Sequence, residues 1–466
     1  MSATSVRRSE GILVGTLSIV VLTVAILQTA VVPILTVIAT QVGASAVNVS
    51  WVLTANLLAA AASTPLIGRL ADLRSKKRVL LAVLGLVLAG SVLAAVTSSL
   101  ALLVLARVLQ GASFSLYPVS VAVLRDEVPA ERLVRSMAVL SAMLGLGGGL
   151  GLVVTGLLMK GNADYHRVFW LTTAFSVAIT IAVAVVVPRR DNQSTGSIDW
   201  AGALGLALGL SALLLALTES GRWGGDSVKT IGLAAAGLGI MAGWWRWERR
   251  CLFLGSQPLV SVGMLARRPI LLTNIATVLV GMGLYFVFLG LTDFVETPTA
   301  SGYGFGASVL DASMVFLLPG AIAASVTAVF NGRYIERFGA RVVGMTGAAA
   351  GVLGFLLLAT LHTSRWEVIA AYLLANAYIS LAYGALPVLV VGEVDARETA
   401  VATSMNAIAR TVGSAIGAAL VAVILSPKAK GANGFIAEHD YVILFALGGL
   451  SAVAAVLFIA ATPRRV

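Results

Sequence analysis

Long apolar segments recur from one end of the chain to the other, and short polar or basic connections separate them. Most of these segments reach the roughly 20 residues that an α-helix needs to cross the hydrocarbon core of a bilayer. The pattern therefore predicts an all-α integral membrane protein with fourteen spans. The spans fall near 12–36, 46–68, 79–99, 101–124, 136–159, 168–188, 198–218, 228–246, 270–292, 307–330, 341–361, 367–391, 399–425 and 441–462.

Composition strengthens this prediction, because 59% of the residues are hydrophobic and only 11% are charged, against about 25% charged in soluble domains. The first apolar segment follows a basic start and is too long for the apolar region of a signal peptide, so we expect it to remain as the first span. The single cysteine, Cys251, excludes a disulfide framework within a monomer, and no Cys/His pattern indicates a metal site. We expect a monomer without a bound cofactor.

Positive charge gathers in the connections on one side of the predicted bundle. The densest connection reads GRLADLRSKKR, from Gly68 to Arg78, and holds five cations around one acid, Asp72. An even number of spans puts both termini on one side, and the positive-inside rule assigns that side to the cytoplasm. Topology thus explains the net charge of +11 without nucleic-acid binding. The excess of arginine over lysine is consistent with a GC-rich bacterium, so we expect the bacterial cytoplasmic membrane.

The chain also contains an internal repeat. A second copy of the charged connection, GRYIERFGAR, follows span 10, and a pair of glycines in span 5 recurs in span 13. The matches agree in offset, in order and in their predicted side of the membrane. Together they are therefore stronger evidence for a repeat than any one matched pair of residues. The matched positions, at offsets of 264 to 266 residues, are Gly68 with Gly332, Arg69 with Arg333, Asp72 with Glu336, Gly147 with Gly413 and Gly151 with Gly417.

The repeat predicts an architecture of 6 + 2 + 6 helices, because spans 1 to 6 correspond to spans 9 to 14. Residues 1–190 form an N-terminal six-helix half, residues 191–266 an inserted helix pair with a cytoplasmic linker, and residues 267–466 a C-terminal six-helix half. Transporters are commonly built from repeated halves that hold the substrate between them near the bilayer midplane.

The charged connection resembles the signature of the major facilitator superfamily, G-x-L-a-D-r-x-G-r-k. Gly68, Leu70, Asp72, Lys76 and Lys77 occupy the matching positions. The resemblance implies the major-facilitator fold, with two pseudo-symmetric six-helix halves.

Two further motifs extend the resemblance. Arg107, Gln110 and Gly111 in span 4 are similar to the family's R-x-x-q-G, and GLGGGLGLVVTG, from Gly145 to Gly156, is similar to its Gly-rich antiporter motif g-x-x-x-G-P-x-x-G-G. With fourteen spans, the chain resembles the fourteen-helix drug:proton antiporter branch.

The chain departs from the family pattern at four positions. Ser75 replaces the second glycine of the loop signature, and Leu152 and Thr155 replace the proline and one glycine of the antiporter motif. Many relatives carry an aspartate in span 1 where this chain has Gln28.

The resemblance implies a gate that closes the cytoplasmic side in the outward-open state. Asp72 is the acid that can hold and release a contact there, with Arg125 at the end of span 4 as its partner. The remaining basic residues are explained equally well by topology alone. The predicted gating residues are Gly68, Arg69, Asp72, Arg74, Arg125, Gly332, Arg333 and Glu336, and the predicted helix-packing glycines are Gly147, Gly151, Gly156, Gly413 and Gly417.

Arg107 lies inside span 4, and an ionisable residue within a span indicates function. Snorkelling of its long side chain to the outer interface is the alternative. A substrate path needs apolar and aromatic walls with a few polar groups, and other polar residues in the spans could equally serve helix packing. The candidates for the substrate cavity are Gln28, Asn56, Arg107, Gln110, Tyr117, Tyr285, Asn376, Tyr378 and Asn406.

Spans 1 to 6 contain no carboxylate at mid-depth. The repeat offset, however, maps Gln28 onto Asp293. Our hypothesis is that Asp293 is the proton-coupling carboxylate, with Glu296 or Asp311 as helper or alternative, because burial of an acid favours its protonated form. The alternative is that Asp293 lies in an outer loop.

The resemblance implies proton-coupled efflux of lipophilic drugs or toxic metabolites, cationic compounds among them, by alternating access. The expected partners are a small lipophilic substrate, protons and the lipid bilayer, with the proton gradient as energy source. No Walker A pattern occurs, and no enzyme activity is expected. The alternatives are a uniporter or a lipid or metabolite exporter without proton antiport, and a transporter-like membrane sensor.

Overall fold

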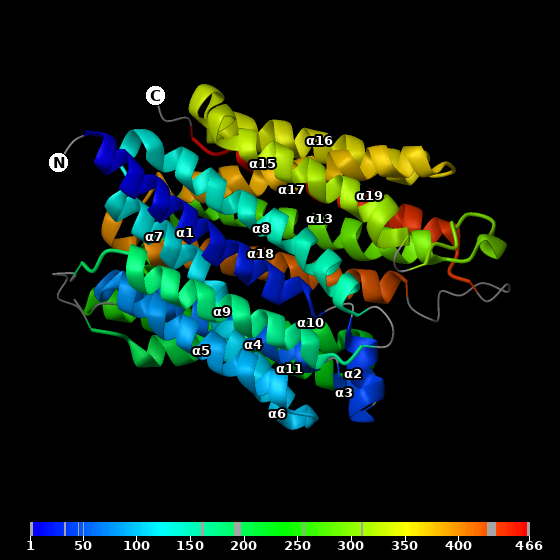
Figure 1. Ribbon diagram of the computed structural model, residues 1–466, viewed down its shortest axis with the longest axis horizontal. Helices are drawn as coiled ribbons and strands as arrows, with labels where there is room; N and C mark the ends of the chain where they lie inside the picture. Colours follow the sequence, from blue (N-terminus) through cyan, green and yellow to red (C-terminus); the bar gives the residue numbers. More distant parts are fainter. Residues whose placement is uncertain are drawn as a thin grey trace. The chain divides into compact units, whose positions relative to one another are not determined.

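The computed structural model of the protein is built from α-helices (Figure 1), fourteen of which, within the described residues, are long and apolar enough to cross a membrane. This confirms the predicted number of spans and the all-α fold class. The structure describes residues 3–31, 34–44, 46–49, 51–159, 163–190, 197–254, 256, 258–308, 311–425 and 435–463.

The first six spans contain seven long helices, because span 4 is made of two helices in series. A 3₁₀ turn, η2 (Ala112–Ser115), joins these two helices into one span over Leu100–Glu127. Two short helices, α2 (Leu35–Val42) and α3 (Ala46–Val49), connect the first two spans. The long helices are α1 (Ala3–Thr29), α4 (Trp51–Leu73), α5 (Lys76–Val96), α6 (Leu100–Gly111), α7 (Leu116–Glu127), α8 (Ala130–Leu158) and α9 (His166–Val186).

The remaining eight spans follow in the order that the repeat predicts. Spans 7 and 8 are α10 (Trp200–Trp223) and α11 (Val228–Phe253), and a short helix, α12 (Val262–Ala266), leads on to span 9. The last six spans are α13 (Arg268–Glu296), α15 (Leu318–Phe338) with the π-helical turn η4 (Ala312–Leu317) before it, α16 (Ala340–Thr360), α17 (Arg365–Val391), α18 (Thr399–Ile424) and α19 (Glu438–Ala460). The short turns η3 (Thr299–Ser301) and η5 (Ala396–Glu398) precede η4 and α18.

The chain divides into two compact units. Unit 1 comprises Met1–Leu215, Ala235–Leu265 and Val394–Ala407, and unit 2 comprises Ala216–Ala234, Ala266–Glu393 and Ile408–Val466. Unit 1 therefore includes the first part of α18, which comes late in the sequence. The division of the sequence at residues 190 and 266 reflects the repeat and remains a prediction.

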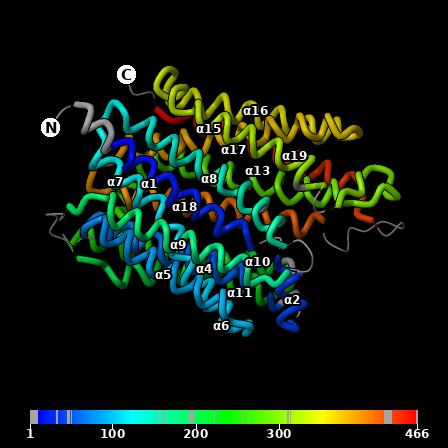
Figure 2. The backbone as a smooth tube through the Cα atoms, in the orientation of Figure 1, coloured from blue at the N-terminus to red at the C-terminus, as the bar shows by residue number. Residues whose placement is uncertain are grey.

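The two units pack equivalent helices in the same way (Figure 2). In unit 1, α4 and α5 pack on α6, and α9 packs on α5 and α1. In unit 2, the corresponding helices α15 and α16 pack on α17, and α19 packs on α16 and α13. The contacts thus follow the internal repeat found in the sequence.

The repeated glycines let the fifth helix of each six-helix set approach the first. A Cβ added at Gly147 would lie 2.5 Å from the carbonyl oxygen of Leu22, and one at Gly151 would lie 2.2 Å from Thr29 Oγ1. These α8 glycines seat the helix against α1. Gly156 does not share this role, because no atom lies within 4 Å of the position that its Cβ would take.

In unit 2 the equivalent contact joins α18 to α13. A Cβ at Gly413 would lie 2.0 Å from the carbonyl oxygen of Val278, and one at Gly417 would lie 2.8 Å from that of Met282. Small residues permit such backbone approach in membrane proteins, where lipid supplies no hydrophobic force between helices.

The turn inside each charged connection explains why one copy lacks a glycine. Gly339, between α15 and α16, has a positive φ of 82°, a conformation that side chains with a Cβ rarely adopt. Ser75, at the equivalent turn between α4 and α5, has a φ of −60° and an extended backbone. The departure from the signature at Ser75 therefore costs no backbone strain.

We expect Gly413→Ala to lower the apparent melting temperature of the purified protein in detergent, because the new methyl group overlaps the α13 backbone. Overpacking of this kind typically costs about 1–3 kcal/mol. Gly85→Ala is the matched control, since Gly85 has no atom within 4 Å of its Cβ position. Equal melting temperatures for the two variants would contradict the packing role of Gly413.

Candidate functional site

Asp72 in the last turn of α4 binds the N-terminus of α18. Its side chain is buried, with 2% of its surface exposed. Oδ1 accepts a hydrogen bond from the backbone N–H of Ala400 at 3.1 Å, and Oδ2 accepts one from Val401 at 2.9 Å. The first N–H groups of a helix have no acceptor within the helix and carry its positive dipole end. Asp72 thus supplies both the acceptors and the complementary charge.

Arg125 in the last turn of α7 holds the chain just before and at the start of the same helix. Its Nη1 donates to Thr399 Oγ1 at 2.5 Å and to the carbonyl oxygen of Asp395 at 3.3 Å. Its Nη2 donates to the carbonyl oxygen of Val394 at 2.7 Å. We call Asp72, Arg125 and residues 394–401 the α18 latch. Asp72 and Arg125, which the sequence predicts to be partners, thus both bind this segment, and their pairing as a gate remains a prediction.

Gly68, one turn before Asp72, allows α4 to approach α18 at the latch. A Cβ at Gly68 would lie 2.3 Å from Ser404 Oγ and 3.0 Å from the carbonyl oxygen of Ala400. A larger residue would push α18 away from the carboxylate of Asp72. The glycine and the aspartate of the signature therefore serve one contact.

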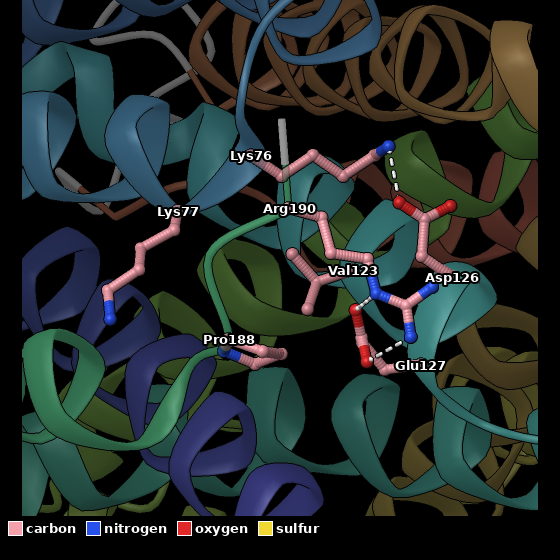
Figure 3. A pocket seen from close by; sticks show the side chains of 7 residues that line it. All are labelled: Lys76, Lys77, Val123, Asp126, Glu127, Pro188 and Arg190. Atoms are coloured by element: carbon pink, nitrogen blue, oxygen red, sulfur yellow. Dashed lines mark hydrogen bonds and ion pairs between the residues drawn. The ribbon is translucent and has the colours of Figure 1, made fainter. Parts of the chain in front are cut away.

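Two ion pairs lie beside the latch, on the end of unit 1 that carries the Gly68–Arg78 connection, called the basic end below (Figure 3). Lys76 Nζ lies 2.6 Å from Asp126 Oδ2. Arg190 binds Glu127 through two nitrogens, with Nε 2.6 Å from Oε1 and Nη2 3.0 Å from Oε2. Lys77 extends away from both pairs (Figure 3). These contacts tie α5 and the chain after α9 to the end of α7.

The second copy of the connection lacks a buried acid. Glu336, which matches Asp72, is exposed in the last turn of α15, and so is Arg333. Arg333 lies over the ring of Phe330, with 6.0 Å from Cζ to the ring centroid, and Gly332 is buried. The two copies, equivalent in sequence, are thus in different environments in this conformation. Of the other predicted gating cations, Arg69 is half-buried and Arg74 is exposed.

Arg107 is fully enclosed in unit 1, so it does not snorkel. Its Nε donates to the carbonyl oxygen of Val52 at 3.1 Å, and its Nη1 donates to that of Leu27 at 3.4 Å and to Gln110 Oε1 at 2.7 Å. Asn56 Nδ2 in turn donates to the carbonyl oxygen of Arg107 at 2.8 Å. Every acceptor named here is neutral.

Gln110 extends this network to a fourth helix. Its Nε2 donates to Ser91 Oγ at 2.9 Å, so α1, α4, α5 and α6 are joined through buried polar groups. Three predicted cavity residues, Asn56, Arg107 and Gln110, therefore form one cluster. A buried network in which the members are satisfied makes the local packing specific.

The other predicted cavity residues are dispersed. In unit 1, Gln28 is half-buried, Asn406 is buried, and Tyr117 shares a 2.9 Å hydrogen bond with Ser141. In unit 2, Tyr285 and Asn376 are half-buried, and Asn376 Nδ2 donates to the carbonyl oxygen of Tyr372 at 3.1 Å.

Tyr378 packs between helices, because a Cβ at Gly351 of α16 would lie 2.4 Å from its ring. Arg410 was not among the predicted cavity residues. Its guanidinium carbon lies 5.0 Å from the centre of the Tyr383 ring, within cation–π range. The position of Arg410 inside span 13 is the sequence signal that could have identified it as a candidate.

The predicted proton-coupling acids lie near helix ends and turns. Asp293 is exposed in the last turn of α13, where it accepts a 2.6 Å hydrogen bond from Tyr441 Oη. Glu296 is half-buried at the end of α13, and Asp311 is exposed and accepts from Ser308 Oγ at 2.7 Å. The burial expected for Asp293 is absent because its helix stops only three residues later, at Glu296.

The most deeply buried acid of the described residues is Glu248 on α11, with no exposed surface. Glu248 lies in the inserted helix pair, which has no counterpart in the repeat. Comparison of the two repeat copies therefore could not identify it.

Comparisons with known proteins agree on the fold. A family model described as the Major Facilitator Superfamily matches residues 17–418. The chain is 27% identical to the uridine/deoxyuridine transporter of Lactococcus lactis subsp. cremoris over 76% of this chain and 73% of that protein. It is also 27% identical to the tetracenomycin C resistance and export protein of Streptomyces glaucescens over 83% of this chain and 70% of that protein.

A solved structure, described as the human organic anion transporter MFSD10, matches with a TM-score of 0.66 at 15% identity, over 96% of this chain and 99% of that chain. This likeness concerns the fold alone. The chain spans 56% of the length of two matched, uncharacterised Mycobacterium tuberculosis transporters.

We expect Asp72→Ala to lower the apparent melting temperature in detergent, because it leaves two buried N–H groups of α18 without acceptors. Such a loss typically costs about 1–3 kcal/mol. Glu336→Ala is the matched control, since an exposed substitution of this kind usually changes stability by less than about 0.5 kcal/mol. An equal effect of the two substitutions would show that the capping contact does not stabilise the protein.

Proposed function

Because the chain belongs to the Major Facilitator Superfamily, we propose that it exports lipophilic drugs or toxic metabolites, cationic compounds among them, in exchange for protons. The membrane is the bacterial cytoplasmic membrane, and the basic end faces the cytoplasm together with both termini. The assignment to export rests on relatives such as the Streptomyces resistance and export protein. The proposed orientation follows from the positive-inside rule, applied to the basic connections of this chain.

The observation that carries the proposal is the α18 latch. A transporter that works by alternating access needs contacts that are specific but reversible, since its two states differ by only a few kcal/mol. Asp72 and Arg125 both bind the first turn of α18 or the chain just before it. Water can replace both sets of hydrogen bonds when the segment withdraws.

In the proposed cycle, the latch holds the basic end shut while the opposite end is open. Release of α18 from Asp72 and Arg125 then admits substrate from the cytoplasm. The carboxylate gains solvation when it is released, which offsets part of the lost contact with the helix dipole. Glu336 is the residue that would take the corresponding role in another state of the cycle.

A second candidate is a metabolite carrier without proton antiport. Carboxylates in the described spans lie in the turns near the helix ends, and Gln28 stands where many relatives have an aspartate. The relative named as a uridine/deoxyuridine transporter favours a metabolite as the substrate.

We expect cells that produce the protein to accumulate less of a fluorescent lipophilic cation than cells without it. A proton uncoupler should abolish the difference, because the exchange is driven by the proton gradient. Cells that produce Gly68→Val, which disrupts the latch, should accumulate more of the cation than cells that produce the wild type. Gly85→Ala is the control. Export that resists the uncoupler would refute proton antiport, and saturable uridine flux without drug export would establish the metabolite carrier.

The coupling role of Asp293 remains a hypothesis, and Asp293→Asn tests it. If Asp293 exchanges the proton, the substitution removes the pH dependence of transport in proteoliposomes, while Asp226→Asn, at an exposed acid between α10 and α11, leaves it unchanged. An unaltered pH dependence in Asp293→Asn, at normal protein levels, would assign coupling to another group.

A further inference from the structure

Glu248 is an acid enclosed in protein, and none of its surface is exposed. The indole of Trp244, one turn earlier on α11, and the backbone N–H groups of Leu259 and Val260 face its carboxyl group. Among the described residues, no Lys or Arg is among the groups that act on it. Buried charges in native proteins are usually paired with an opposite charge, so this acid calls for a physical explanation.

A second acid, Asp199, directs one oxygen to the same place. A Cβ added at Gly202 of α10 would lie 2.5 Å from Asp199 Oδ2 and 2.7 Å from Glu248 Oε1. The two carboxyl oxygens are therefore separated by no more than the sum of these distances. A side chain at position 202 would displace one of these two carboxyl groups.

Asp199 is well supplied with donors. Its Oδ1 accepts from the backbone N–H of Gly202 at 2.9 Å, at the start of α10, and its Oδ2 accepts from Trp247 Nε1 at 2.8 Å. The thiol of Cys251 lies 3.8 Å from Oδ2. These contacts leave the oxygens of Asp199 little capacity to bind a metal ion.

Glu248 has donors but no cation beside it among the described residues. The groups that face it are Asp199 from the start of α10, Trp244 on its own helix, and the backbone N–H groups of Leu259 and Val260 from the segment before α12. Arg249 and Arg250, its neighbours in sequence, are exposed. Burial of an ionised carboxylate without a counter-charge is unfavourable, and a second negative charge nearby adds to the cost.

We propose that Glu248 and Asp199 form a proton-binding site at the basic end of the inserted helix pair. The proton resides on Glu248, and the carboxyl group can donate a hydrogen bond to Asp199 Oδ2. The site lies outside the two six-helix halves and is independent of the transport activity proposed above. It requires no cofactor and no other ligand.

Protonation of Glu248 controls the packing of α11 on α10. Close contacts continue along this helix pair, where a Cβ at Gly205 would lie 3.5 Å from Trp244 and one at Gly209 would lie 2.7 Å from Met241. Loss of the proton places two like charges beside Gly202. The stabilisation is therefore complete at acidic pH, and it is lost as rising pH removes the proton from the folded protein.

The test is thermal unfolding of the full chain in detergent from acidic to alkaline pH, with Glu248→Gln as the main variant. The glutamine mimics the protonated acid, so we expect its melting temperature to stay high where that of the wild type falls. Glu336→Gln is the matched control at an exposed acid and should keep the wild-type profile. Asp199→Asn, which removes the like charge, should make the fall smaller, because ionised Glu248 then costs less.

Infrared spectroscopy provides an independent measurement. We expect a carbonyl band of a protonated carboxyl group in the wild type that persists above the pH at which exposed acids ionise, and that is absent from Glu248→Gln. The proposal is overturned if the two infrared spectra agree in this band. It is equally overturned if Glu248→Gln lowers the melting temperature at every pH with an unchanged pH profile, since Glu248 would then be ionised and paired. If Glu248→Gln does not fold, the proposal is tested by the pH profile of Asp199→Asn and by the carboxyl band of the wild type.

Discussion

Hydrocarbon offers no hydrogen bonds, so each polar group within a span must find its partner inside the protein. Arg107 meets this constraint by binding two backbone carbonyl oxygens and Gln110. Asp72 meets it at a helix end, where two N–H groups of α18 have no other acceptor. The first solution joins four helices through enclosed side chains, whereas the second joins one helix end by contacts that water can replace. The same constraint thus yields both an enclosed network and a contact at a helix end.

Close approach of helices depends on glycine in this protein, and it determines where the polar contacts can form. Gly68 brings α4 near enough to α18 for Asp72 to reach its N-terminus. Gly202 opens the space in which Asp199 and Glu248 meet. In both places an acid and a glycine act together. Gly68 and Asp72 lie on one helix, whereas Gly202 and Glu248 lie on different helices.

The sequence predicts the number of spans, the repeat and the packing glycines Gly147, Gly151, Gly413 and Gly417, because each of these can be recognised from a pattern along the chain. Gly413 and Gly417 could be identified from their offset alone. The burial of an acid is harder to predict, because it depends on where a helix stops and on what packs against it. Asp293 is exposed since α13 ends at Glu296. Glu248 is enclosed because α10 starts beside it, which no local pattern around Glu248 reveals.

The turn between α4 and α5 and the turn between α15 and α16 obey different backbone rules, although they descend from one repeated motif. Ser75 adopts an extended conformation that any residue can take, whereas Gly339 has a positive φ. The two turns therefore tolerate different substitutions: a side chain at the first turn meets only its neighbours, whereas a side chain at the second also meets backbone strain.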